Sequence, residues 1–129
     1  MASPELERLI FHEGKMNKLN KLEESVLNEM LSGNNFTVYK VQLKKIRDIK
    51  RKYSGVGFFT EFIFENPVEV DSANEKFQIS DVYAEIPSLK HGAGFVLFVE
   101  KGQLKMLEGF TYDEPWPEDV NGFVLKRIP

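Results

Sequence analysis

Apolar residues recur at steps of three and four near the start of the chain, a pattern that predicts two helices there. The first helix is expected to begin at Ser3-Pro4-Glu5, where Ser can cap free N–H groups and Pro suits the first helical position, and to end near Gly14. The second is expected to end at Gly33-Asn34-Asn35, since Gly and Asn tolerate the backbone conformation of a helix C-cap. Its apolar residues fall on one face: Met16, Leu19, Leu22, Val26 and Met30.

From Phe36 onward the pattern favours strands. The segment Leu43–Tyr53 is ambiguous, because its apolar residues fit one face of a helix while the alternation of charged and apolar residues near its end fits a strand. We favour a strand, since the Ser54-Gly55 turn signal and a clear strand at Val56–Glu65 follow it.

The remaining strands are expected at Ile79–Ile86, Phe95–Val99, Gln103–Phe110 and Gly122–Ile128. Phe95–Val99 is apolar on both faces and is therefore predicted to be central, with Lys101-Gly102 as the hairpin turn that follows it. The sequence thus predicts a single α+β domain over residues 1–129, in which two N-terminal helices pack on one face of a mainly antiparallel sheet of about six strands.

Composition supports a core of ordinary size. Hydrophobic residues make up 42% of the 129 residues, and eleven of them are Phe. The chain has no cysteine, which excludes disulfides, thiolate catalysis and cysteine-ligated metals and suits a reducing compartment. No apolar run approaches the roughly 20 residues that span a bilayer, and Met1–Ile10 lacks the pattern of a secretory signal. We therefore expect a cytoplasmic protein that does not enter membranes.

The net charge of −3 is unevenly distributed. Lys40–Lys52 holds seven basic residues and one acidic residue, which raises the hypothesis of nucleic-acid binding through Lys44, Lys45, Arg47, Lys50, Arg51 and Lys52. Against it, the chain is acidic overall and the basic residues alternate with aliphatic rather than base-stacking aromatic residues. We favour a solvated, lysine-rich edge strand over a nucleic-acid site.

Catalytic and metal-binding patterns are sparse in the sequence. The two histidines, His12 and His91, belong to different predicted elements and lack the spacing of a helical zinc site. We expect no catalytic residue, no metal and no cofactor. The alternative is a small-molecule-binding or hydrolytic protein with a pocket near His91, a residue that lies in a glycine-rich turn beside a long apolar strand.

An acidic aromatic loop is the most unusual local feature. Between Glu108 and Asp119 there are five acidic residues, no basic residue, and a Pro-Trp-Pro sequence whose prolines stiffen the chain. A stiff loop loses little entropy on binding, so it suits recognition through Tyr112, Asp113, Glu114 and Trp116. The competing interpretation is that Trp116 folds back to cap the core.

Three segments together resemble a small bacterial protein family with no assigned activity. They are Ser54–Phe62 (SGVGFFTEF), His91–Phe95 (HGAGF) and Leu107–Pro117 (LEGFTYDEPWP), within roughly residues 40–118. The resemblance implies no catalytic residue. Bacterial domains of this size include toxin-neutralising immunity proteins, an analogy of size and composition. We expect a non-enzymatic protein-interaction module, immunity-protein-like in kind.

Overall fold

The computed structural model describes residues 17–129, so the helix predicted at Ser3–Gly14 lies outside the described residues. Its helical elements are α2 (Lys21–Met30), the 3₁₀ turn η1 (Asn34–Phe36) and α3 (Thr37–Leu43). Its strands are β1 (Asp48–Tyr53), β2 (Gly57–Ile63), β3 (Phe77–Ile79), β4 (Val82–Glu85), β5 (Ala93–Glu100), β6 (Gln103–Thr111) and β7 (Val124–Arg127).

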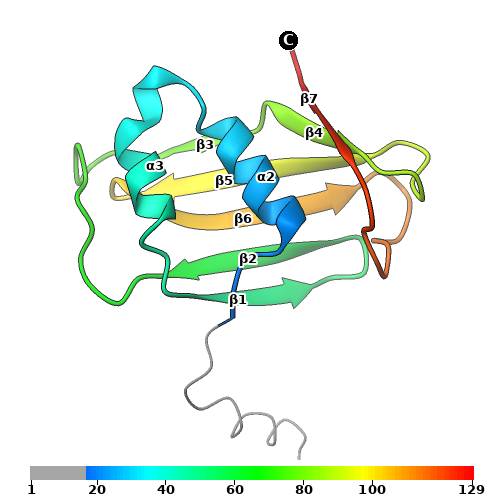
Figure 1. Ribbon diagram of the computed structural model, residues 1–129, viewed down its shortest axis with the longest axis horizontal. Helices are drawn as coiled ribbons and strands as arrows, with labels where there is room; N and C mark the ends of the chain where they lie inside the picture. The colour runs from blue at the N-terminus through cyan, green and yellow to red at the C-terminus, as the bar shows by residue number, and fades with distance from the viewer. Residues whose placement is uncertain (1–16) are drawn as a thin grey trace, which may run out of the picture.

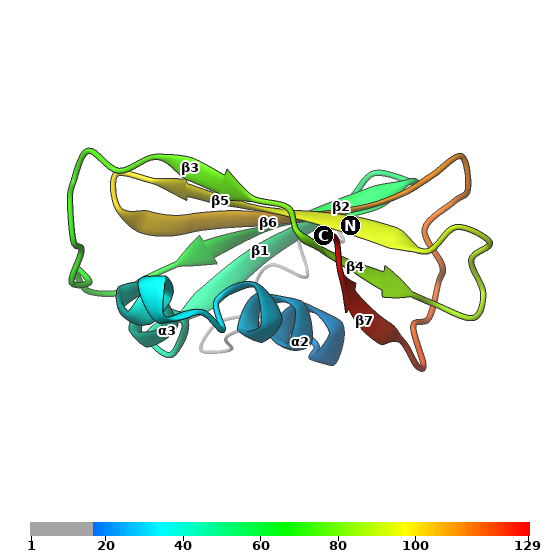
Figure 2. The same ribbon diagram turned by 90° about the horizontal axis from the view of Figure 1, so that it is seen from above.

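The seven strands form one antiparallel sheet in the order β1-β2-β6-β5-β4-β7, with β3 pairing a different stretch of the β5 edge. Both α2 and α3 lie across the same face of this sheet, as Figures 1 and 2 show. The predicted α+β class, with helices on one face of an antiparallel sheet, is confirmed. The two described helices are not both the N-terminal pair that the sequence predicted, because α3 replaces a predicted strand.

Helix α2 begins later than its apolar stripe suggested. Asn20 accepts a hydrogen bond from the Glu23 backbone N–H at 2.8 Å, and the Glu23 carboxylate accepts one from the Asn20 N–H at 2.8 Å. This reciprocal capping box satisfies two N–H groups that a helix start leaves free. The helix therefore starts at Lys21, and Leu22, Val26, Leu27 and Met30 are buried against the sheet.

Helix α3 corrects the prediction of strand structure from Phe36 onward. Tyr39 and Gln42, three residues apart, are both buried, whereas Val41 is exposed. That spacing puts the two buried side chains on one helical face, and their tertiary contacts outweigh the strand preference of the β-branched residues Val38 and Val41. Within the ambiguous segment, Leu43 ends the helix and the strand starts only at Asp48.

Most of the later strands agree with the prediction. β2 buries Phe58 and Phe62 on one face, and β5 is an internal strand that buries Phe95, Leu97 and Val99. The Lys101-Gly102 hairpin turn is present, with both residues at positive φ, as a two-residue turn between twisted strands requires. The single strand expected at Ile79–Ile86 is instead two strands, β3 and β4.

The core lies between the sheet and the two helices. The Phe58 ring lies directly over Gly109 of β6, where an added Cβ would come within 2.2 Å of the ring. The same ring contacts Phe95 and the edge of Trp116, with centroid distances of 6.5 Å and 5.1 Å. Phe58 thus carries the core out to the loop after β6. Within residues 17–129, no helix is long and apolar enough to cross a membrane.

Candidate functional site

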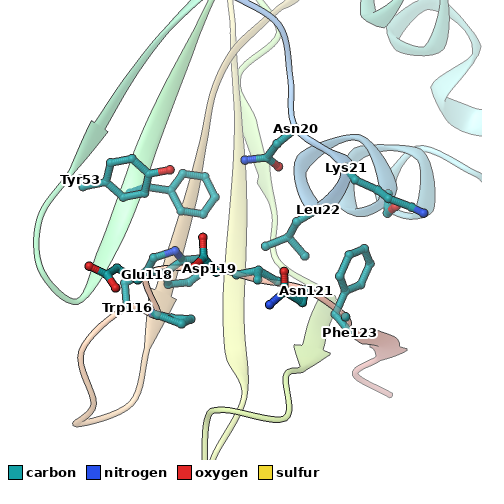
Figure 3. A pocket seen from close by; sticks show the side chains of 14 residues that line it. Asn20, Lys21, Leu22, Tyr53, Trp116, Glu118, Asp119, Asn121 and Phe123 are labelled. Atoms are coloured by element: carbon teal, nitrogen blue, oxygen red, sulfur yellow. The ribbon is translucent and has the colours of Figure 1, made fainter.

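A cavity of about 500 Å³ lies at the end of the sheet where α2 begins, and we call it the Trp116 cavity. Three separate segments enclose it: the start of α2, the β1–β2 hairpin and the loop from Trp116 to Phe123 that leads into β7. Figure 3 shows Tyr53 and Trp116 on one side of the cavity and Leu22 and Phe123 on the other. Its lining residues are Asn20, Lys21, Leu22, Ser25, Tyr53, Phe58, Trp116, Pro117, Glu118, Asp119, Val120, Asn121, Gly122 and Phe123.

Backbone hydrogen bonds fasten the acidic loop to the β1–β2 turn. The Trp116 N–H donates to the Gly55 carbonyl at 2.7 Å, and the Thr111 N–H donates to the Val56 carbonyl at 2.9 Å. The Thr111 hydroxyl lies within hydrogen-bonding reach of the carbonyl oxygens of Val56 and Glu114. Gly55 itself has a φ of 88°, a conformation that suits glycine. The loop is therefore tied to a neighbouring hairpin at both of its ends.

Glu114 fastens the loop to a second segment. Its carboxylate accepts hydrogen bonds from the backbone N–H groups of Lys90 and His91 at 3.0 Å and 3.1 Å. These bonds, that of Lys90 first and that of His91 next, stabilise the ionised form and lower the pKa of Glu114 below its ordinary value. Glu114 is therefore a structural anchor of the loop, and its carboxylate is already engaged.

The walls of the Trp116 cavity are aromatic and partly uncovered. Trp116 is half-buried, with its ring at 72° to that of Phe58, so it both caps the core and faces the cavity. Tyr53 is 62% exposed, although its ring lies only 6.4 Å from that of Phe58. Trp116 therefore makes the core-capping contact, and recognition of a partner through this residue stays a prediction.

The rim of the cavity carries opposite charges at different places. Glu118 and Asp119 are exposed and make no ion pair within the part of the chain that the structure describes. Lys21 is the one basic residue of the lining, and Figure 3 shows its side chain extending away from Trp116 and Glu118. The side of the cavity next to Trp116 is therefore acidic.

A buried ion pair fixes the helical wall of the cavity. Glu23, which has no exposed surface, accepts hydrogen bonds from Arg51 Nε and Nη2 at 2.8 Å and 2.6 Å and from the Thr60 hydroxyl at 2.5 Å. The bond to Glu23 raises the pKa of Arg51. This pair joins the first turn of α2 to β1 and β2, so the cavity wall cannot shift without exposing or breaking it.

The predicted binding residues do not form one surface. Tyr112 lies on the other side of the sheet end, its ring 5.5 Å from that of Phe110, and both rings cover Gly94 of β5. Asp113 is exposed at a φ of 59° in the turn that follows β6. Of the residues named from the sequence, only Trp116 lines the cavity.

His91 lies at a separate cavity of about 560 Å³, formed by the Pro87–Gly92 turn and the start of β7. This cavity shares Gly122 and Phe123 with the Trp116 cavity. A hollow at His91 is thus present, while ligand binding or hydrolysis there stays a prediction. No group of three or more metal-binding side chains comes together within residues 17–129.

The basic residues of Lys40–Lys52 are divided between helix α3 with the turn after it and the edge strand β1. Lys44 follows α3, whereas Lys50 and Lys52 lie on the edge strand β1. Arg51 is engaged by Glu23, and Arg47 pairs with Glu65. The placement of the lysines on an edge strand matches the favoured interpretation of this segment, and nucleic-acid binding stays untested.

Sequence reasoning missed Tyr53 and Phe123 as cavity residues. Both lie in segments that looked like ordinary strand ends, and only the pairing of β1 with β2 and of β7 with β4 brings them near Trp116. The sole local signal was Asn20 with Glu23, which could have placed the start of α2 at the cavity.

Comparison with known proteins gives no match: no family model covers the chain, and no curated protein and no solved structure is significantly similar to it.

Proposed function

We propose that this protein is a non-enzymatic protein-interaction module whose partner docks at the Trp116 cavity. The observation that carries the proposal is the fastening of the acidic loop at Gly55, Val56 and the Lys90-His91 backbone, which holds Trp116 at the edge of a cavity of about 500 Å³. A wall that is already ordered loses little conformational entropy when a partner binds.

The side chains that face the cavity are of the kinds that dominate protein interfaces. Tryptophan and tyrosine supply large contact areas with few rotatable bonds, and they are enriched among residues whose truncation costs the most binding energy. Trp116 and Tyr53 occupy such positions, half-buried and exposed respectively, with polar groups of Asn121 and Ser25 around them. An aromatic centre with a polar rim is the ordinary anatomy of an interface.

The proposal includes a bacterial, cytoplasmic setting and an immunity-protein-like role, in which binding to a toxin would be the function. The cysteine-free composition supports the setting, and the size of the domain supports the role by analogy.

Selection of peptides from a displayed random library on the immobilised protein tests the proposal. Affinities of the enriched peptides are then measured for the wild type, for Trp116→Ala and for Tyr112→Ala, a matched aromatic control on the other side of the loop. We expect Trp116→Ala to weaken binding by about thirtyfold, corresponding to about 2 kcal/mol, and Tyr112→Ala to leave it within about twofold. A thermal melt of each variant confirms that it is folded. Enrichment of peptides that bind Trp116→Ala as well as the wild type would contradict the proposal.

A further inference from the structure

Building on the proposed function, we infer that the Trp116 cavity takes a basic side chain of the partner, arginine in preference to lysine. The cavity combines aromatic rings with carboxylates on the same side, an arrangement that neither feature would give alone. The partner's group at the point of contact is therefore an exposed arginine side chain of a protein.

The aromatic rings of the cavity suit a guanidinium group. Tyr53 and Trp116 come from different segments and lie on the same side of the cavity (Figure 3). A guanidinium group is planar and weakly hydrated, so it stacks on aromatic faces, and tryptophan is the strongest aromatic partner for a cation. The Trp116 backbone N–H donates to the Gly55 carbonyl at 2.7 Å, and its ring packs on Phe58 at a centroid distance of 5.1 Å, so the ring is already ordered before the cation arrives.

The rim of the cavity beside Trp116 is negatively charged. Glu118 and Asp119 follow two and three residues after Trp116, line the same cavity and have no ion-pair partner within residues 17–129. Glu114 cannot serve, since its carboxylate is bound to the backbone of Lys90 and His91. A guanidinium that stacks on the ring could present its N–H fork to either free carboxylate.

Lys21, the basic residue of the lining, does not neutralise this rim. Its side chain extends away from Trp116 and Glu118, toward the far side of the cavity. A partner's cation at Trp116 would therefore meet the two carboxylates before the Lys21 ammonium. An acidic side chain of a partner would be repelled at the same place by the carboxylates of Glu118 and Asp119.

The chain offers a site-specific probe for this inference, because Trp116 is its only tryptophan. Tryptophan fluorescence, excited beyond the absorption of tyrosine, then reports on the cavity alone. The probes are capped tripeptides, acetyl-Ala-Arg-Ala-amide and the same peptide with lysine, with citrulline or with norleucine at the centre. Citrulline keeps the shape of arginine and removes its charge.

We expect the arginine peptide to saturate the fluorescence change with an affinity about tenfold above that of the citrulline and norleucine peptides, and a few-fold above that of the lysine peptide. The double variant Glu118→Gln/Asp119→Asn should lose most of this tenfold preference. The matched double variant Glu108→Gln/Asp113→Asn removes the same formal charge from residues that do not line the cavity, and it should keep the preference.

Other results would overturn the inference. Equal binding of the arginine and citrulline peptides would show a cavity that selects apolar shape instead, and the proposed function would still stand. Equal loss in both double variants would show that the net charge of the loop, and not the rim of the cavity, attracts the cation. If none of the peptides changes the Trp116 fluorescence, the inference fails, and the library selection decides the proposed function separately.

Discussion

The two ends of the sheet are closed in opposite ways. At the end where β5 turns into β6, the buried side chain of Gln42 donates to the carbonyls of Glu69 and Gly102 at 3.0 Å and 2.9 Å and accepts from the Leu104 N–H at 2.9 Å. At the other end, the acidic loop is fastened mainly through its backbone and helps to enclose a cavity of about 500 Å³. Figure 1 shows α3 over the first end and the segment that leads to β7 at the second.

The difference shows two ways in which hydrogen bonds can order the end of a sheet, one from the interior and one from the margin. Gln42 makes the three hydrogen bonds by entering the space between α3 and the hairpin, and a cavity of about 390 Å³ remains beside it. The loop reaches comparable order from outside, through Glu114 and the Trp116 N–H, and leaves its aromatic side chains available. A buried side chain orders the first end from within. Hydrogen bonds at the margin order the second end and leave Trp116 and Tyr53 partly uncovered.

The largest expected effect on stability comes from the first turn of α2, which forms one wall of the Trp116 cavity. Glu23→Gln should lower the free energy of unfolding by about 3 kcal/mol, because it leaves the Arg51 guanidinium facing an amide in place of its buried carboxylate. Urea denaturation at neutral pH measures the change. Glu24→Gln, the neighbouring exposed residue, is the control and should change the free energy by less than about 0.5 kcal/mol. Equal effects of the two substitutions would mean that the pair does not hold the wall.

The next largest effect is expected at the end of the sheet that holds Gln42. Gln42→Ala is expected to lower the free energy of unfolding by about 2 kcal/mol, since it leaves buried groups of Gly102 and Leu104 without partners. Gln78→Ala, on an exposed position of β3, is the matched control and should be nearly neutral. Peptide binding at the Trp116 cavity should persist in Gln42→Ala below its melting temperature. If binding were lost together with this end, the two ends would not be independent.

The smallest effect concerns the pH dependence of the loop. The folded-state pKa of Glu114 is lowered. The stabilisation of the folded state by the Glu114 carboxylate is therefore present above the ordinary pKa of a glutamate and is lost as the pH falls through the lowered value. The amide ¹H–¹⁵N shifts of Lys90 and His91 should report this titration, with a midpoint below that of a glutamate in an unstructured peptide. The titration should vanish in Glu114→Gln and remain in Glu118→Gln. A midpoint at or above the peptide value would refute the anchoring role.

Much of the sheet could be predicted, because the sequence of most strands and turns specifies their structure without help from distant contacts. The alternation in β2, the apolar run of β5 and the Lys101-Gly102 turn each specify their structure within a few residues. Helix α3 escaped prediction because its sequence has β-branched residues, and the contacts that stabilise it, such as that of Gln42 with Leu104, are 62 residues apart. The candidate site was predictable only at Trp116, since Tyr53 and Phe123 reach it through strand pairing.

The contact of Arg127 with α2 has a consequence for the order in which the molecule folds. Arg127 Nε donates to Glu29 Oε2 at 3.1 Å, and its guanidinium also pairs with Asp81. Its separation from Glu29 is 98 residues, and closing so long a chain segment costs entropy before any contact repays it. We therefore expect the β2–β6–β5 sheet to form first and β7 to dock late. The Phe123 wall just before β7 would then be among the last parts to assemble, so that binding competence arises only when folding is nearly complete.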